Sequence, residues 1–235
     1  MPTQSHSNVP YKAWLLLTAG PALFFLGIAG VSIFFSAQEV PEAQIPERVT
    51  ELAPHILLGV QVCLAALLAL FAVQVKAAWI LPNPSKAFAD ITLGLLAGAL
   101  LVILYLYWLA PLLETLQRTF GDYVPPGAVL PTVSSSIGLF FVANVLLAPF
   151  IEETLYRGVA IPLLSRYLGA LGAVVLTCLF FGLLHWAGGI WYMLLTGIVA
   201  GGVFAALFYW RGGVLAPFTA HFALNLIEFL YVWQA

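Results

Sequence analysis

Two adjacent acidic residues, Glu152 and Glu153, stand in an otherwise apolar stretch of the chain, in the sequence FIEETLYRG (150–158). A charged side chain at the middle of a bilayer costs about 2.5–3.5 kcal/mol on insertion scales, so such residues are candidates for function. Glu153 and Arg157 are four residues apart and would share one face of a helix, where they can form an ion pair. Glu152 would point about 100° away. This spacing predicts that Glu153 neutralises Arg157 and that Glu152 is free to act as a base; the alternative is a charged helix end at the membrane interface.

Two further apolar segments carry polar residues at the same spacing. FFGLLHW places Phe181 and His185 four residues apart, and HFALN places His221 and Asn225 four residues apart. Alone, His185 could be a packed, hydrogen-bonded polar residue, and His221 with Asn225 could form a hydrogen-bonded pair between helices. Together with Glu152 they could hydrolyse a bond: the carboxylate takes a proton from water, a histidine holds that water, and donors stabilise the developing oxyanion.

The composition indicates that these segments lie in a membrane. Apolar residues make up 63% of the 235 residues and charged residues 8%, and the mean hydropathy is +1.03. A soluble domain has about a quarter charged residues, so this chain has too few to cover a surface that faces water. The net charge is −2 without a basic block, so no nucleic-acid partner is expected. Cys63 and Cys178 lie in apolar runs and are interpreted as small hydrophobic residues.

A spanning helix needs about 20 mostly apolar residues. The sequence has seven candidate runs: 13–36, 53–75, 88–110, 134–156, 168–187, 190–209 and 213–234. They predict an all-α, polytopic membrane helix bundle of about seven to eight transmembrane helices with a catalytic cavity inside. Residues 1–133 and 134–235 would form one continuous membrane domain. Gly94-x-x-x-Gly98 and Gly197-x-x-x-Gly201 predict close helix packing.

The distribution of lysine and arginine predicts the orientation. With the N-terminus in the cytoplasm, the outer segments hold only Arg48 and Arg118, and the inner segments hold Lys12, Lys76, Lys86, Arg157, Arg166 and Arg211. Positive residues favour the cytoplasmic side. We therefore expect a multi-pass protein with a cytoplasmic N-terminus, in a bacterial cell membrane.

Three motifs in this order resemble those of the CPBP intramembrane proteases, which include the CAAX prenyl endopeptidases and the bacteriocin-processing relatives often labelled Abi. They are E-E-x-x-x-R at 152–157, F-x-x-x-H at 181–185 and H-x-x-x-N at 221–225, and the resemblance covers about residues 134–230. It implies that Glu152 activates water held by His185, and that His221 and Asn225 stabilise the oxyanion. The supporting residues would be Glu153, Arg157 and Phe181. The implied partner is a membrane-associated peptide or protein, prenylated or not, in the lipid bilayer.

The mechanism could be metal-free or could use zinc bound by Glu152, His185 and His221 with an open position for water. The helical zinc motif H-E-x-x-H is absent, so we favour a mechanism without a cofactor. G-x-S-G, expected of a rhomboid-like enzyme, is absent too, and Asp90 and Asp122 are placed at a helix start and in a loop rather than as an intramembrane pair.

Two other classes of function remain alternatives. One is a proton-coupled transporter in which Glu152, His185, His221 and Glu228 form a relay, although no internal repeat is evident. The other is a non-catalytic immunity or scaffold protein with the same fold. For Glu228 itself we expect a place at the outer interface, and for Asp90 a capping role near the inner one.

The predicted boundaries leave one conflict. If the fourth and fifth helices are 134–156 and 168–187, Glu152 lies near the cytoplasmic end of one and His185 near the far end of the other. They can meet only if the fourth helix is longer or the stretch 158–167 re-enters the membrane. We therefore predict that Glu152 lies below the membrane surface.

Overall fold

The structure, a computed structural model, describes residues 11–79, 84–124 and 136–234, and this part of the chain is all-α. Its helices are α1 (Tyr11–Ala37), α2 (Ile45–Ala69), α3 (Ala72–Ala78), α4 (Pro84–Leu104), α5 (Ala110–Phe120), α6 (Ile137–Phe140), α7 (Ala148–Glu153), α8 (Ile161–Leu184), α9 (Ile190–Leu195), α10 (Gly201–Arg211) and α11 (Leu215–Gln234). Wide π-helical turns join several of them end to end: Tyr105–Leu109, Phe141–Leu147, Thr154–Ala160 and Thr196–Ala200.

Three of the four wide turns stand just before a proline, namely Pro111, Pro149 and Pro162. A proline has no N–H for the carbonyl four residues earlier, and its ring clashes with that carbonyl. In all three cases this carbonyl lies inside the wide turn. Widening the turn by one residue lets the helix continue through the proline.

Five described segments are long and apolar enough to cross a membrane: Tyr11–Ala37, Glu42–Ala69, Ser85–Phe120, Ile137–Leu184 and Ile190–Arg211. This is consistent with a multi-pass membrane protein. The segment Ile137–Leu184 combines two of the predicted runs, and α11 coincides with the last one. The number of spans therefore stays a prediction.

The long segment reverses direction at Gly169, whose φ of 69° and ψ of 171° lie outside the helical range. Glycine adopts this positive φ without steric cost. The helix before the reversal continues through Arg157, so the predicted end at 156 is wrong. Glu152 precedes Gly169 by 17 residues and His185 follows it by 16, so the two arms bring both residues to the same depth in the bundle. This resolves the conflict between the predicted boundaries.

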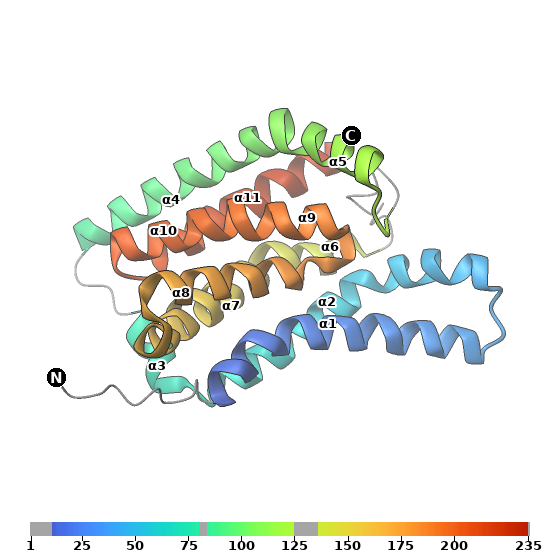
Figure 1. The fold of residues 1–235 in the computed structure, drawn as a ribbon, viewed down its shortest axis with the longest axis horizontal. Helices are drawn as coiled ribbons and strands as arrows, with labels where there is room; N and C mark the ends of the chain where they lie inside the picture. Colours follow the sequence, from blue (N-terminus) through green and yellow to red (C-terminus); the bar gives the residue numbers. More distant parts are fainter. Residues whose placement is uncertain (1–10, 80–83, 125–135, 235) are drawn as a thin grey trace.

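A second reversal, at Gly189 (φ 103°), sends the chain back into α9 and α10. We call the two ends of the bundle the Gly169 end and the Gly189 end. The starts of α1, α4 and α11 lie at the Gly169 end, and the turn between α1 and α2 lies at the other (Figure 1). Of the six basic residues predicted to lie inside, five are near the Gly169 end. The sixth, Arg157, is buried inside the bundle, 12 residues before Gly169.

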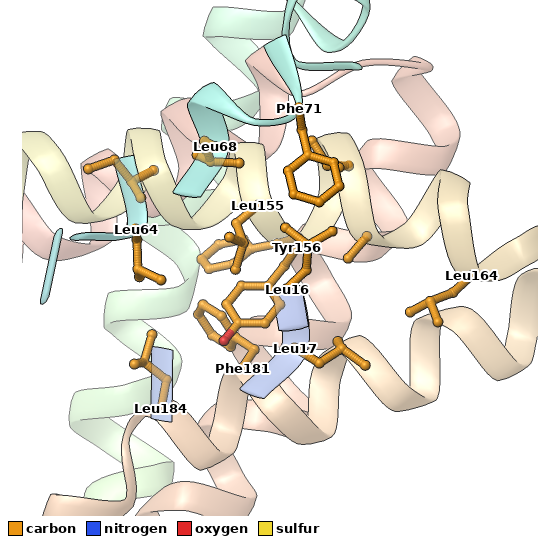
Figure 2. Packing of buried hydrophobic residues seen from close by; sticks show 14 of the residues in the cluster. Leu16, Leu17, Leu64, Leu68, Phe71, Leu155, Tyr156, Leu164, Phe181 and Leu184 are labelled. Carbon is orange, nitrogen blue, oxygen red and sulfur yellow. The ribbon is translucent and has the colours of Figure 1, made fainter. Parts of the chain in front are cut away.

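The hairpin of α1 and α2 is attached to the bundle by one half only. The buried residues of α1 all fall between Ala13 and Pro21, and the half nearest the turn projects away from the other helices (Figure 1). The attached half joins a shared apolar core in which Leu16, Leu17 and Leu64 pack with Tyr156 and Phe181 (Figure 2). The hairpin therefore contributes to the centre of the bundle.

The helices α4 and α11 lie side by side along the bundle (Figure 1). A Cβ atom at Gly94 would clash with Thr219 and the carbonyl of Ala216, and one at Gly98 would clash with Ala223 and the carbonyl of Ala220. The predicted close packing at these glycines is confirmed. It is confirmed also at Gly197, whose backbone touches that of Gly182 on α8.

We expect the substitution Gly98→Ala to destabilise the protein by about 1–3 kcal/mol, because its Cβ meets backbone that cannot move aside. The measurement is denaturant unfolding in detergent. The matched control is Gly59→Ala, where a Cβ meets no atom of the described chain within 4 Å. There the better helix propensity of alanine should leave stability equal or raised by up to about 1 kcal/mol. Equal effects of both substitutions would contradict the tight contact.

Candidate active site

Glu153 is the centre of a buried charge cluster. Its Oε1 atom accepts a hydrogen bond from Arg157 Nη1 at 3.0 Å and another from His221 Nδ1 at 3.0 Å. Glu153 and Arg157 have no exposed surface, and His221 is 3% exposed. The predicted ion pair is confirmed, and it reaches α11 as well. The alternative of a charged helix end at the interface is wrong, because these charges are in the interior.

Arg157 is held by carbonyl and aromatic groups in addition to Glu153. Its Nη2 atom donates to the carbonyl of Gly201 at 3.0 Å. The guanidinium carbon lies 4.4 Å from the ring centroid of Phe181 and 5.4 Å from that of Phe204. These contacts replace water around the cation. The arginine thus joins α7, α8 and α10 at one point.

Phe181 and His185 lie on the same face of α8, as predicted. The Nδ1 atom of His185 is 2.8 Å from the carbonyl oxygen of Phe181. A carbonyl oxygen only accepts, so Nδ1 carries the proton and the Nε2 atom of a neutral ring is left as an acceptor. The Phe181 ring centroid is 5.0 Å from that of His185 and 5.7 Å from that of His221. Phe181 therefore spaces the two histidines.

Asn225 lies on α11, one turn after His221, and is 8% exposed. Its Nδ2 atom donates to the backbone carbonyl of Asn144 at 2.8 Å. One hydrogen of the amide is used in this bond, so the other can serve a ligand. Asn144 itself was not predicted, since its contribution is a backbone carbonyl and its side-chain type gives no signal for it.

Glu152 faces α2 instead of α11. Its Oε1 atom accepts a hydrogen bond from Gln61 Nε2 at 2.9 Å, and its Oε2 atom is buried without a partner in the described part of the chain. Glu152 is 3% exposed and so lies in the protein interior, while its depth below the membrane surface stays a prediction. Gln61 was missed by the sequence analysis. A polar amide inside the apolar run 53–75 was the signal that could have found it.

A cavity of about 60 Å³ lies between α4, α8, α9 and α11. It is lined by three of the four predicted catalytic residues, namely His185, His221 and Asn225. Glu152 is not among the residues that line it, although its carboxylate interacts electrostatically with His221 and Arg157. The structure thus brings all four residues into the interior, but only three of them onto one cavity.

Two acidic residues lie elsewhere than expected. Glu228 lines the cavity instead of facing the outer interface, because it is two turns after His221 on the same face of α11. Asp90 is inside α4 and 4% exposed, where it forms an ion pair with Arg211 at the end of α10. It is not a helix cap. Pairing with Arg211 offsets the cost of its burial.

The zinc alternative requires Glu152, His185 and His221 to converge on one ion. In residues 11–79, 84–124 and 136–234, no three His, Cys, Asp or Glu side chains are grouped closely enough to hold a metal ion. In addition, the Glu152 carboxylate is bonded to Gln61 on α2, whereas His221 lies on α11. The described residues do not fit this three-ligand site, and we derive no step through zinc.

A short segment after α5 ties the two halves of the chain together at the Gly189 end. Asp122 Oδ1 accepts from the backbone N–H of Ile190 at 2.9 Å and of Tyr123 at 2.7 Å. The Tyr123 hydroxyl donates to the carbonyl of Trp186, directly after His185. Burial raises the pKa of Asp122, but the hydrogen bonds from Ile190, Tyr123 and the Gln117 side chain outweigh it and hold the pKa below its usual value. We call residues 121–124 the strap.

Comparison with known families identifies the second half of the chain. Residues 134–227 match a family described as type II CAAX prenyl endopeptidase Rce1-like, and this segment is therefore an Rce1-like CAAX prenyl endopeptidase (CPBP) domain. It contains all seven residues of the three motifs and excludes Gln61. The comparisons with curated proteins and with solved structures found no match.

We expect Arg157→Met to destabilise the protein by about 3–5 kcal/mol, because it leaves the buried carboxylate of Glu153 without its cation. The double variant Glu153→Gln/Arg157→Met should recover part of this loss. The control is Arg118→Met, which breaks a pair of the same spacing with Glu114 that is exposed by 67% and 49% and should cost about 0.2–1 kcal/mol. Denaturant unfolding in detergent measures all three, and equal losses at positions 157 and 118 would contradict the cluster.

The strap should stabilise the fold in a pH-dependent way. Because the pKa of Asp122 is lower in the folded state, its contribution is complete above the unfolded pKa of about 3.9 and is lost as pH falls through the folded value. We expect Asp122→Asn to unfold at lower temperature than the parent protein near pH 6, and this difference to shrink below about pH 4. A difference in melting temperature that is unchanged down to the acidic limit would contradict this assignment.

Proposed function

We propose that the protein is an intramembrane endopeptidase that hydrolyses peptide bonds of membrane-associated substrates by a glutamate-activated water. Three observations support this proposal: the cavity shared by His185, His221 and Asn225, the burial of Glu152, and the match of residues 134–227 to an Rce1-like domain. This family supports a protease over the transporter and scaffold alternatives.

Glu152 is proposed as the general base. Its Oε2 atom has no partner in the described chain, so it can accept a proton from a water molecule as the water oxygen attacks the carbonyl carbon of the substrate. Glu153 also has an Oε2 atom without a partner in the described chain, but its Oε1 atom is bonded to both Arg157 and His221, so this carboxylate is committed to neutralising the buried cluster. The neutral His185 ring can hold the same water, since its Nε2 atom is left as an acceptor.

His221 and Asn225 are proposed to stabilise the tetrahedral intermediate. The attack breaks the carbonyl π bond and puts a negative charge on its oxygen. Asn225 has a second amide hydrogen for this oxygen, and a protonated His221 can donate from Nε2. When the intermediate collapses, the carbonyl double bond re-forms, the carbon–nitrogen bond breaks and the proton taken by Glu152 passes to the leaving amine, which leaves a carboxylic acid and an amine as products.

The substrate class is a peptide or protein that reaches the site from the bilayer, prenylated or not. The walls of the cavity support this, because leucine, valine, alanine and phenylalanine side chains make up just over half of its lining, beside the proposed catalytic groups, Glu228, Thr196 and two tyrosines. The five basic residues near the Gly169 end support an orientation with that end and the N-terminus in the cytoplasm.

Substitution of the two glutamates tests the proposal. On a library of membrane peptides in proteoliposomes, we expect Glu152→Ala to lower kcat at least about 100-fold, the range in which a general base contributes. Glu153→Gln should retain partial activity in the fraction that folds, because it weakens support without removing the base. Melting temperatures of both variants separate folding from chemistry, and undiminished cleavage by Glu152→Ala would overturn the mechanism.

A chelator arm in the same assay tests the metal alternative. Cleavage unchanged by a chelator, and not raised by added zinc, is expected of the glutamate mechanism. Loss of cleavage that zinc restores would replace it by a metal-dependent one.

A further inference from the structure

Gln61 meets Glu152 from a part of the chain that lies outside the matched domain. It is on α2, has no exposed surface, and donates through Nε2 to Glu152 Oε1 at 2.9 Å. Within residues 11–79, 84–124 and 136–234 this is the one hydrogen bond recorded for the Glu152 carboxylate. The flanking residues Val60 and Leu64 are buried in the apolar core, so the helix that carries Gln61 is fixed against the bundle.

Burying the Gln61 amide and the Glu152 carboxylate costs free energy, and the hydrogen bond between them has to offset this cost. A buried polar group without a hydrogen-bond partner is destabilising. The bond to Gln61 offsets this for one oxygen of Glu152 and fixes the plane of the carboxylate. The remaining oxygen, Oε2, is thereby held in one direction with its lone pairs free.

A second orphaned acceptor lies in the same pair of residues. Gln61 Oε1 is buried without a partner in the described chain, as is Glu152 Oε2. Two buried acceptors on directly bonded side chains call for a donor with two hydrogens, and water is the smallest molecule that supplies them. The amide would then accept one hydrogen of a water molecule whose other hydrogen goes to Glu152, so Gln61 Oε1 and His185 Nε2 would hold that first hydrogen in turn and not at the same time.

We propose that Gln61 is a positioning residue for the reaction: its Nε2 holds Glu152, and its Oε1 orients the attacking water toward Glu152 Oε2. This inference rests on the proposed function. The titratable groups that interact with Glu152 are Glu153 on the same helix, Arg157 in the wide turn after it, and His221 on α11. None of them bonds to the oxygen that Gln61 holds, so Gln61 acts on Glu152 alone.

Three variants test the role of Gln61. Gln61→Leu keeps the volume and removes both polar atoms, and we expect kcat to fall about 10–100-fold, as for other orienting partners of catalytic groups, while KM stays within about twofold because the substrate is not touched. Gln61→Glu places two carboxyl groups at hydrogen-bond distance, which then share a proton, so the acidic limb of the activity profile should move up by about one pH unit or more. Gln61→Asn keeps an amide on a side chain that is one methylene shorter, so we expect its kcat to stay below that of the parent protein.

The matched control is Gln117→Leu, which changes another buried glutamine, 3% exposed, on α5. It should lower the melting temperature without moving the pH profile of kcat. A double-variant cycle adds a readout independent of activity: if the two side chains are bonded, the melting-temperature losses of Gln61→Leu and Glu152→Gln will be smaller together than their sum.

The outcomes separate the two proposals. If Glu152→Ala abolishes cleavage but Gln61→Leu keeps the parental kcat and pH profile, the proposed function stands and the role of Gln61 is wrong. If Gln61→Leu loses activity only in proportion to folded protein, with an unshifted profile for Gln61→Glu, Gln61 is structural and the inference is overturned. If Glu152→Ala still cleaves, both the mechanism and this inference are overturned.

Discussion

Neutralisation of one buried carboxylate, that of Glu153, organises the centre of the molecule. A charge in an apolar interior has to be paired, and Glu153 Oε1 is paired with both Arg157 and His221. The arginine is in turn bound by the Gly201 carbonyl and stacked on Phe181. One oxygen atom thereby fixes the relation of α7, α8, α10 and α11. Neighbouring Glu152, pointing to another side of its helix, is left free of this cluster, and this separation makes two adjacent glutamates chemically different.

The chain reversals give the site its depth. The reversals at Gly169 and Gly189 fold the second half of the chain back on itself twice, so residues far apart in sequence arrive level with each other. Arg157, Phe181 and Gly201 meet in this way, and Glu152 and His185 reach the same depth. Both reversals have positive φ values that suit glycine. Within residues 136–234 the motif residues lie in helices, in the wide turns that continue them or, for His185, at a helix end, which fits the requirement that backbone groups in lipid be paired within the helix.

The sequence predicted the helical class, the residues of the three motifs and the Glu153–Arg157 pair, because each depends on local composition or on a spacing of four. It did not predict the bond from His221 to Glu153, which depends on how α11 packs. It ended the fourth helix at 156 because hydropathy falls at the charges, whereas the structure pairs these charges and lets the helix continue. Gln61 was missed because only ionisable residues and Asn225 were considered as intramembrane polar groups. The place of Glu228 was not predicted, because the cavity that it lines is formed by packing between helices and leaves no pattern in the sequence of α11.

The wide turns before Pro111, Pro149 and Pro162 also affect how helix faces are assigned along this chain. Each adds one residue to a turn, so side chains beyond it are rotated by about 100° relative to a regular helix. A helical wheel drawn without a break from residue 137 to 168 would therefore put the later residues on the wrong face. Such a wide turn therefore changes which side of one continuous helix faces the interior and which side faces outward. The amphipathic pattern has to be rephased after each of these three turns, but not at Pro21 in α1 or Pro54 in α2, where no wide turn occurs.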